Sequence, residues 1–212
     1  MPLIPTPERP FASFDFEDIA RGVVLTPFYC YASKDSSSTT YKMSPDLIHS
    51  GVTAIRDSID AGSLGTNTYT FDSIPFNLPR IINGEVTFSF DLAVRGPSGG
   101  TSTAQCTIKL FHWDGSSATQ LGTTFTTEEL IAAAATVETE MQAANFTVTN
   151  QKFKIGEQVR IELAIIRTGT TGSGNEREVG IDPQNKDGVR LTPSTDGQVT
   201  TQSVLYIPFK MN

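Results

Sequence analysis

The stretch Glu85-Val-Thr-Phe-Ser-Phe-Asp-Leu-Ala-Val-Arg95 decides the expected fold of this chain. Apolar residues occupy every second position from Val86 to Val94, with Thr, Ser, Asp and Ala between them. Because successive side chains of a β-strand point to opposite faces, this alternation predicts a strand with one face in a core and one in water. A helix would spread the same apolar residues around its whole circumference.

The same alternation returns between Val159 and Ile165, where Arg160, Glu162 and Ala164 separate the apolar positions. Half-solvated strands are typical of antiparallel sheets, so the sequence predicts an all-β fold, an antiparallel β-sandwich or jelly roll. About eight strands at short spacing are expected, as such a fold requires. They cover residues 22–32, 68–77, 85–95, 104–113, 146–148, 158–167, 179–181 with 189–191, and 203–209.

Two segments show helix signals. Thr126-x-x-Glu129 precedes Leu-Ile-Ala-Ala-Ala-Ala, which is a capping box followed by strong helix formers, and it predicts one short helix at about residues 127–135. Ser44-Pro45-Asp46 also resembles a helix start. The apolar spacing that follows fits a helix only loosely and Gly51 interrupts it, so residues 41–61 are expected to form short strands or irregular structure.

The first residues are rich in proline, which fixes φ and removes a backbone donor. We therefore expect an extended N-terminal arm at residues 1–20 and a β-sandwich domain at residues 21–212. An extended segment can cover a large partner surface, so the arm is the predicted docking element. Its predicted partner-binding residues are Pro2, Leu3, Ile4, Pro5, Pro7, Pro10 and Phe11.

Composition excludes several classes of protein. The 212 residues carry a net charge of −7, which argues against a nucleic-acid-binding surface. No apolar run approaches the length of a membrane span, and the first residues lack the features of a secretory signal. Cys30 and Cys106 each lie in an apolar strand pattern and are expected to be buried free thiols. We therefore expect synthesis in a cytoplasm.

No pattern predicts a catalytic, cofactor-binding or metal-binding residue. Gly96-Pro-Ser98-Gly-Gly100 has the letters of a nucleophile elbow, but a strand and not a helix is expected after it, which favours a hairpin loop. Asp182, Asn185 and Asp187 do not fit the spacing of a calcium loop and favour a polar turn. His49 and His112 lack metal-ligand spacing, so His112 is interpreted as a structural histidine.

Phe111 and Trp113 share the strand face opposite Leu110 and form a candidate exposed aromatic contact. Three interpretations remain open for them. They could pack in the core of a second sheet, cover a contact between subunits, where aromatic residues are enriched, or stack against a sugar ring.

Three segments resemble small virion proteins of tailed bacteriophages. They are Phe14-Asp-Phe-Glu-Asp-Ile-Ala-Arg-Gly22 running into Phe28-Tyr29, then Tyr69-Thr-Phe-Asp-Ser-Ile-Pro-Phe-Asn-Leu-Pro-Arg80 followed by Asn83-Gly84, and Phe153-Lys-Ile-Gly-Glu-Gln-Val-Arg160. The resemblance implies a β-sandwich that serves as a structural or decorating component of a capsid, tail or fibre.

On this resemblance we expect a non-enzymatic virion structural protein, made in the host cytoplasm and located in the virion. The leading hypothesis is a capsid decoration (cement) protein, a homodimer or homotrimer that binds the major capsid protein or other virion proteins and stabilises the lattice by mass action. The alternative is a carbohydrate- or receptor-binding β-sandwich of a tail, fibre or head appendage, with a glycan as partner. A hydrolase on the same fold is a third candidate, which an acidic pair lining a cleft would distinguish. Cofactors, nucleic acid and membranes are not expected.

Overall fold

The computed structural model describes residues 22–35, 38–48, 54–59, 65–169, 175–184 and 202–210. These residues form an all-β fold without a helix. The strands are β1 (Val23–Asp35), β2 (Ser38–Ser44), β3 (Ala54–Ile59), β4 (Gly65–Ser73), β5 (Arg80–Arg95), β6 (Ser102–Trp113), β7 (Ala118–Thr126), β8 (Leu130–Ala132), β9 (Val137–Phe153), β10 (Gln158–Gly169), β11 (Asn175–Gly180) and β12 (Val204–Lys210). The predicted all-β sandwich class is confirmed.

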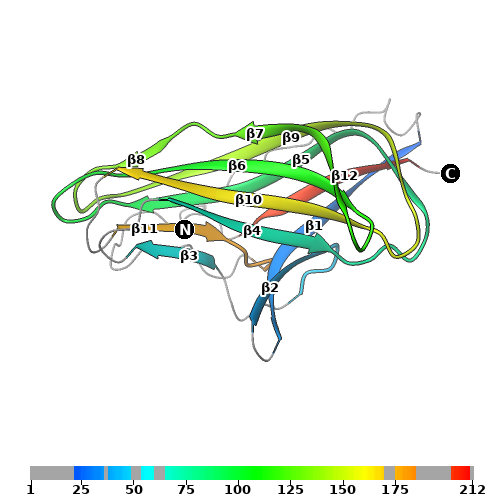
Figure 1. Ribbon diagram of the computed structural model, residues 1–212, viewed down its shortest axis with the longest axis horizontal. Helices are drawn as coiled ribbons and strands as arrows, with labels where there is room; N and C mark the ends of the chain where they lie inside the picture. The colour runs from blue at the N-terminus through cyan, green and yellow to red at the C-terminus, as the bar shows by residue number, and fades with distance from the viewer. Residues whose placement is uncertain are drawn as a thin grey trace, which may run out of the picture.

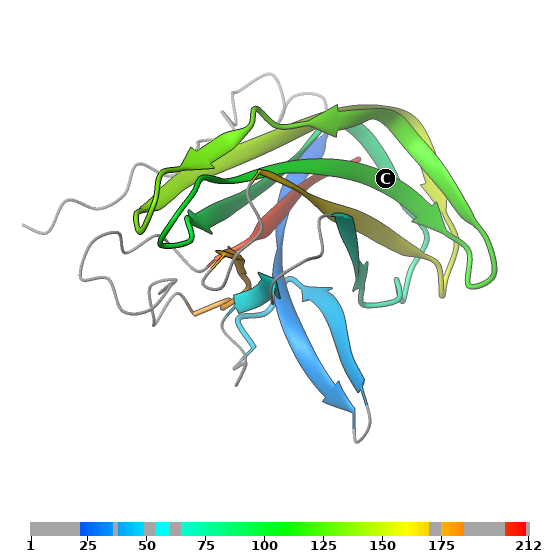
Figure 2. The ribbon, with the colours of Figure 1, turned by 60° about the vertical axis from the view of Figure 1, so that its left-hand side comes forward.

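The strands curve into two facing layers, as Figures 1 and 2 show. One layer has the order β4-β10-β6-β7, and the other runs from β9 through β5 and β12 to β1. A hairpin, β1–β2, carries the chain between the layers, because β2 pairs in parallel with β4. At the other side β7 lies against β9, with Gly122 facing the carbonyl of Thr147. The sheet therefore closes almost completely on itself, which leaves little unpaired edge.

The strand that decided the fold lies at the centre of its layer. β5 pairs with β9 along its whole length on one side, and with β12 and then β11 on the other. Its residues from Val86 to Val94 at alternate positions are fully buried, as the alternation predicts. The expectation of a solvated second face is wrong for half of the strand, because Ser89, Asp91 and Ala93 are buried too.

The predicted helix at residues 127–135 is absent, and the chain there forms the short strand β8 within a loop. Thr127 is held to β6 in two ways: its N–H donates to the carbonyl of Cys106, and its hydroxyl accepts from the N–H of Cys106, each at 2.9 Å. Ala132 is fully buried where β8 pairs with β6. Pairing with the sheet outweighs the helix propensity of the alanines, which amounts to only a few tenths of a kcal/mol per residue.

Within residues 41–61, the described parts agree with the expectation of short strands. β2 ends at Ser44, whose hydroxyl accepts a hydrogen bond from the N–H of Asp46 at 3.1 Å in a turn rather than at a helix start. β3 begins at Ala54. The strand expected at residues 189–191 and the arm at residues 1–20 lie outside the described residues, so the domain division stays a prediction.

Candidate functional site

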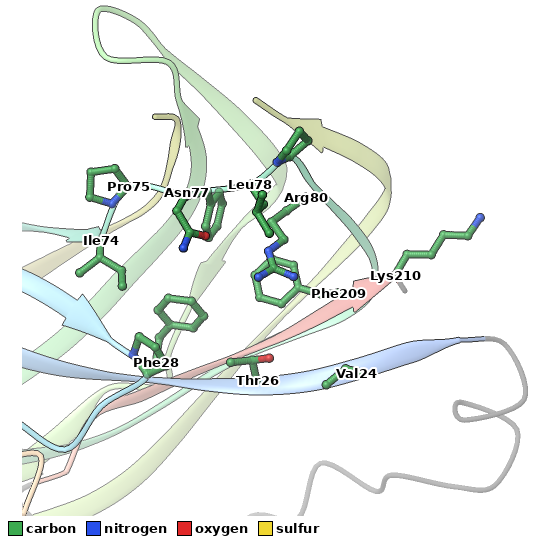
Figure 3. A pocket seen from close by; sticks show the side chains of 13 residues that line it. Val24, Thr26, Phe28, Ile74, Pro75, Asn77, Leu78, Arg80, Phe209 and Lys210 are labelled. Carbon is green, nitrogen blue, oxygen red and sulfur yellow. The ribbon is translucent and has the colours of Figure 1, made fainter. Parts of the chain in front are cut away.

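A groove opens at one end of the sandwich, between the start of β1, the connection from β4 to β5, and the end of β12 (Figure 3). It has a volume of about 820 Å³. Its lining residues are Val24, Thr26, Phe28, Pro45, Ile74, Pro75, Phe76, Asn77, Leu78, Pro79, Arg80, Phe209 and Lys210. The site therefore draws on four segments that are separated in the sequence: residues 24–28, Pro45, residues 74–80 and residues 209–210.

Local sequence explains how each wall forms. Val24, Thr26 and Phe28 line the groove from alternate positions of β1, as the strand period requires. Pro75 and Pro79 lack backbone donors and keep the connection between β4 and β5 out of the sheet. That connection is fixed at Phe76, whose N–H donates to the carbonyl of Glu157 at 3.0 Å while its carbonyl accepts from Gly156 at 2.8 Å.

The floor of the groove is aromatic and its rim is apolar. Phe28, Phe76 and Phe209 are buried, and the ring of Phe209 lies 6.2 Å from Phe28 and 5.6 Å from Phe76 between centroids. Exposed apolar side chains stand on the rim, with exposed fractions of 41% for Val24, 40% for Ile74 and 57% for Leu78. A concave, apolar site of this size is typical of a small-molecule pocket.

Two cations and no carboxylate line the groove. The guanidinium carbon of Arg80 lies 5.5 Å from the centre of the Phe209 ring, over its face. Neither Arg80 nor Lys210 forms an ion pair with any carboxylate of the described residues. By contrast, Arg95, Lys109 and Arg160 are each paired with an acidic residue.

The groove contains no set of groups that could carry out covalent catalysis. Its hydroxyl comes from Thr26, and neither a histidine nor a carboxylate lines it to act as base or to orient one. The acidic pair that would have marked a hydrolase from the sequence is likewise missing from the lining. The residues that line the groove can therefore bind a ligand, but they cannot catalyse a covalent reaction by themselves.

A second polar cluster lies behind the groove around His112. Its Nε2 is 2.7 Å from a carboxylate oxygen of Glu157, its Nδ1 is 3.2 Å from the amide nitrogen of Gln151, and its ring meets the edge of Phe153 with centroids 4.4 Å apart. The pKa of Glu157 is lowered, first by the N–H of Lys154 and then by His112. The described contacts of this histidine include no hydroxyl or thiol, and they join β6, β9 and the turn before β10, as those of a structural histidine do.

Three further candidate nucleophiles in the described residues, Ser98, Cys30 and Cys106, are not assembled with a base. Ser98 lies in the loop between β5 and β6, as expected for a hairpin loop, whereas His112 lies at the far end of β6, so the strand separates them by roughly 30 Å. Cys30 and Cys106 are free and buried, as predicted. Burial raises the pKa of both thiols, to about 12 for Cys106, which makes them poor nucleophiles.

The structure places Phe111 and Trp113 on the outer face of β6, where both are half-buried. The guanidinium carbon of Arg160 lies 3.8 Å from the centre of the Trp113 ring, and Asp72 holds that arginine through two hydrogen bonds of 2.6 and 3.1 Å. One face of the tryptophan is therefore already covered by a paired cation. The contact predicted for these two aromatics stays a prediction.

The other residues singled out from the sequence are not among the described residues of the groove or of the cluster around His112. The partner-binding residues from Pro2 to Phe11 lie outside the described residues, as do His49, Asn185 and Asp187. Asp182 is described, and its carboxylate accepts from the N–H of Gln184 at 3.1 Å, which is the expected polar turn. The described ranges contain no group of three or more potential metal ligands, and no helix there has the length and apolarity to cross a bilayer.

Sequence reasoning missed the groove. The one local signal was Ile74-Pro-Phe-Asn-Leu-Pro-Arg80, a run of large apolar residues held between two prolines, next to a cation. That stretch was assigned to the end of a strand and a turn. The contributions of β1 and β12 could not be seen without the fold.

Comparison with known proteins gives a likeness in structure alone. No family model and no curated protein matches the sequence. An α-amino acid ester hydrolase superposes with a TM-score of 0.52 at 10% identity, over 87% of this chain and 36% of the hydrolase. A CocE/NonD family hydrolase from Staphylococcus aureus gives a TM-score of 0.50 at 10% identity, over 88% of this chain and 36% of that protein. The chain thus spans about a third of the length of the hydrolases that it matches, and at this identity the likeness shows the fold.

This finding overturns the function expected from the sequence. Two solved structures that share the fold with TM-scores of 0.52 and 0.50 are hydrolases. A match to a structure of infectious bursal disease virus has a TM-score of only 0.25, which is too low to support a virion function. The predictions of a non-enzymatic virion structural protein, of a capsid decoration (cement) protein, and of a glycan- or receptor-binding module of a virion appendage are therefore wrong. The fold was predicted correctly, but a β-sandwich hosts many functions, and function follows from a site.

Proposed function

We propose that this chain is the substrate-binding β-sandwich of a hydrolytic enzyme that acts on carboxylic esters. The observation that carries the proposal is the apolar groove at the open end of a fold that also occurs in an α-amino acid ester hydrolase and in a CocE/NonD family hydrolase. The groove is the place in the described chain where an apolar group of a substrate would leave water.

The residues that line the groove would bind the acyl part of the substrate, and the catalytic groups would lie elsewhere. Phe28, Phe76 and Phe209 offer an aromatic surface for the acyl part of an ester, and Leu78 extends that surface toward solvent. Burial of the acyl group against these rings would hold the ester in one orientation, and positioning of this kind lowers the barrier to attack. The nucleophile and its base come from outside the described residues, because the groove itself holds neither.

The proposal is tested with the full chain purified under native conditions together with any stably bound subunit. We expect hydrolysis of p-nitrophenyl butyrate and p-nitrophenyl octanoate above the uncatalysed rate. Leu78→Ser should raise KM for the octanoate ester several-fold while leaving kcat nearly unchanged, because the rim binds ground state and transition state alike. A matched control is Ile155→Ser, since Ile155 is exposed by 66% and does not line the groove.

Absence of turnover with every ester of a panel that varies acyl length and leaving group would overturn the proposal. An equal change of KM in the Leu78 and Ile155 variants would also contradict it, because the groove would then have no special part in substrate binding.

A further inference from the structure

We propose that the groove selects a ligand with an apolar body and a carboxylate head, and that Arg80 binds the head. The inference rests on the proposed function in one respect: such a ligand would be the carboxylic acid that hydrolysis of the ester releases. The binding itself requires no catalysis and is argued from the described side chains alone.

Arg80 is placed so that its hydrogen-bond donors are accessible to a ligand in the groove. Its guanidinium lies over the face of Phe209, with 5.5 Å between the guanidinium carbon and the ring centre, at the aromatic floor of the groove (Figure 3). The N–H groups of a guanidinium lie in its plane, so a ring that covers its face leaves these donors directed outward. A carboxylate accepts from two such donors at once in a charge-assisted pair.

No acidic residue of the described chain competes with a ligand for the charge of Arg80. Lys42, Arg95, Lys109 and Arg160 each form an ion pair with an acidic residue, whereas Arg80 forms none with a described carboxylate. No aspartate or glutamate lines the groove, although the whole chain has a net charge of −7. A positive apolar groove on an acidic protein favours anions over cations through the local potential.

Two neighbours add to the head-group site. Asn77 also lines the groove, from the connection that leads to Arg80 (Figure 3), and its NH₂ group could donate to a carboxylate oxygen. The same view shows the side chain of Lys210 extending away from the other lining side chains. Lys210 therefore contributes a long-range attraction rather than a contact.

The size of the groove sets the body of the ligand. A volume of about 820 Å³ lies within the usual range for pockets that hold small molecules. Phe28, Phe76 and the exposed rim residue Leu78 provide apolar contacts along its length. A medium-length alkyl chain or a single aromatic ring fits this lining better than a polar sugar, which would leave its hydroxyls unpaired against the rings.

The test is equilibrium binding of three probes of equal length to the full chain: octanoate, octanol and octylammonium, measured by isothermal titration calorimetry. Octanoate should bind at least ten times more tightly than octanol, and octylammonium should bind weakest. Arg80→Gln should weaken octanoate binding at least tenfold and leave octanol binding within twofold. Lys152→Gln is the matched control, because Lys152 is an exposed cation of β9 next to the same end of β5 and does not line the groove.

Equal affinity for octanoate and octanol would overturn the assignment, as would equal losses in the Arg80 and Lys152 variants. Binding that appeared only after removal of residues 1–20 would also overturn it, because the groove would then belong to the chain's own segment. Failure of this proposal is separable from failure of the proposed function. Ester hydrolysis without carboxylate preference would reject the head-group site alone, and carboxylate binding without hydrolysis would reject the enzyme alone.

Discussion

Two arginines of this sandwich lie over aromatic rings, and they differ in what else they touch. Arg160 lies over Trp113 and is held by two hydrogen bonds to Asp72, so its charge is neutralised within the fold. Arg80 lies over Phe209 without a carboxylate partner among the described residues. An arginine over an aromatic ring is therefore closed in one place, where a carboxylate pairs its charge, and open in the other, where no described carboxylate does. A charge that the fold does not neutralise remains available for a ligand.

The largest expected effect comes from removal of the ring under the open arginine. Phe209 is only 6% exposed and packs against Phe28 and Phe76. Phe209→Ala should lower the free energy of unfolding by about 3–4 kcal/mol, because a large cavity replaces the ring. Urea denaturation followed by circular dichroism measures the loss. A loss below about 1 kcal/mol would mean that Arg80 and its neighbours do not rest on a packed floor.

A buried acid provides a contrasting case for charge in this fold. Burial raises the pKa of Asp91 from 3.8 to about 7, so the folded chain holds a proton that the unfolded chain has released above pH 4. The contribution of Asp91 to the free energy of unfolding should therefore fall as pH rises from about 4 to about 7, and stay constant above that. The fall should be on the order of 2–4 kcal/mol. Urea denaturation of wild type and Asp91→Asn across this range should show the difference, and parallel curves would contradict it.

Breaking the closed arginine site should have an intermediate effect. Asp72→Ala removes both hydrogen bonds to Arg160 and the carboxylate that lies 3.7 Å from the amino group of Lys42. Because the arginine is largely shielded from water, we expect a loss of about 2 kcal/mol in the free energy of unfolding. A double-mutant cycle with Arg160→Ala measures the coupling between the two residues, and a coupling near zero would show that the pair is not closed.

The smallest effect is expected at the open site. Arg80→Gln should change the free energy of unfolding by no more than about 0.5 kcal/mol, because an exposed cation without an ion pair contributes little. Arg160→Gln is the comparison at the closed site and should cost more under the same urea denaturation. Equal losses in the two variants would erase the distinction between the two arginines.

Where the fold was predictable, the reason is alternation without interruption. β5 keeps strict period two from Val86 to Val94 and β10 from Val159 to Ile165, and the apolar residues of both runs are buried as predicted. β7 was missed because Leu121 and Phe125 are separated by the polar, exposed Thr123, where the register of β7 to β6 shifts between Ile108 and Leu110. A bulge of this kind hides the period from the sequence.

The false helix and the missed groove have different causes. The alanine-rich segment after Thr126 has local helix propensity, and pairing with β6 overrode it. The groove has almost no local signal, because Phe28, Phe76 and Phe209 meet only after the whole sheet has formed. A site made of residues so far apart in the sequence can be recognised in the folded structure, but not from the spacing of residues in the sequence.

The order of strands also bears on how the chain reaches this state. β1 lies between β12 and β2, so one of its two neighbours is the final described strand, Val204–Lys210. The layer that contains β1 cannot be completed during synthesis until that strand has left the ribosome. Folding dominated by such distant pairings is slow, and half-made sheets with open edges are prone to aggregate. We therefore expect truncation before residue 204 to trap the chain in an insoluble form, whatever ligand the groove holds.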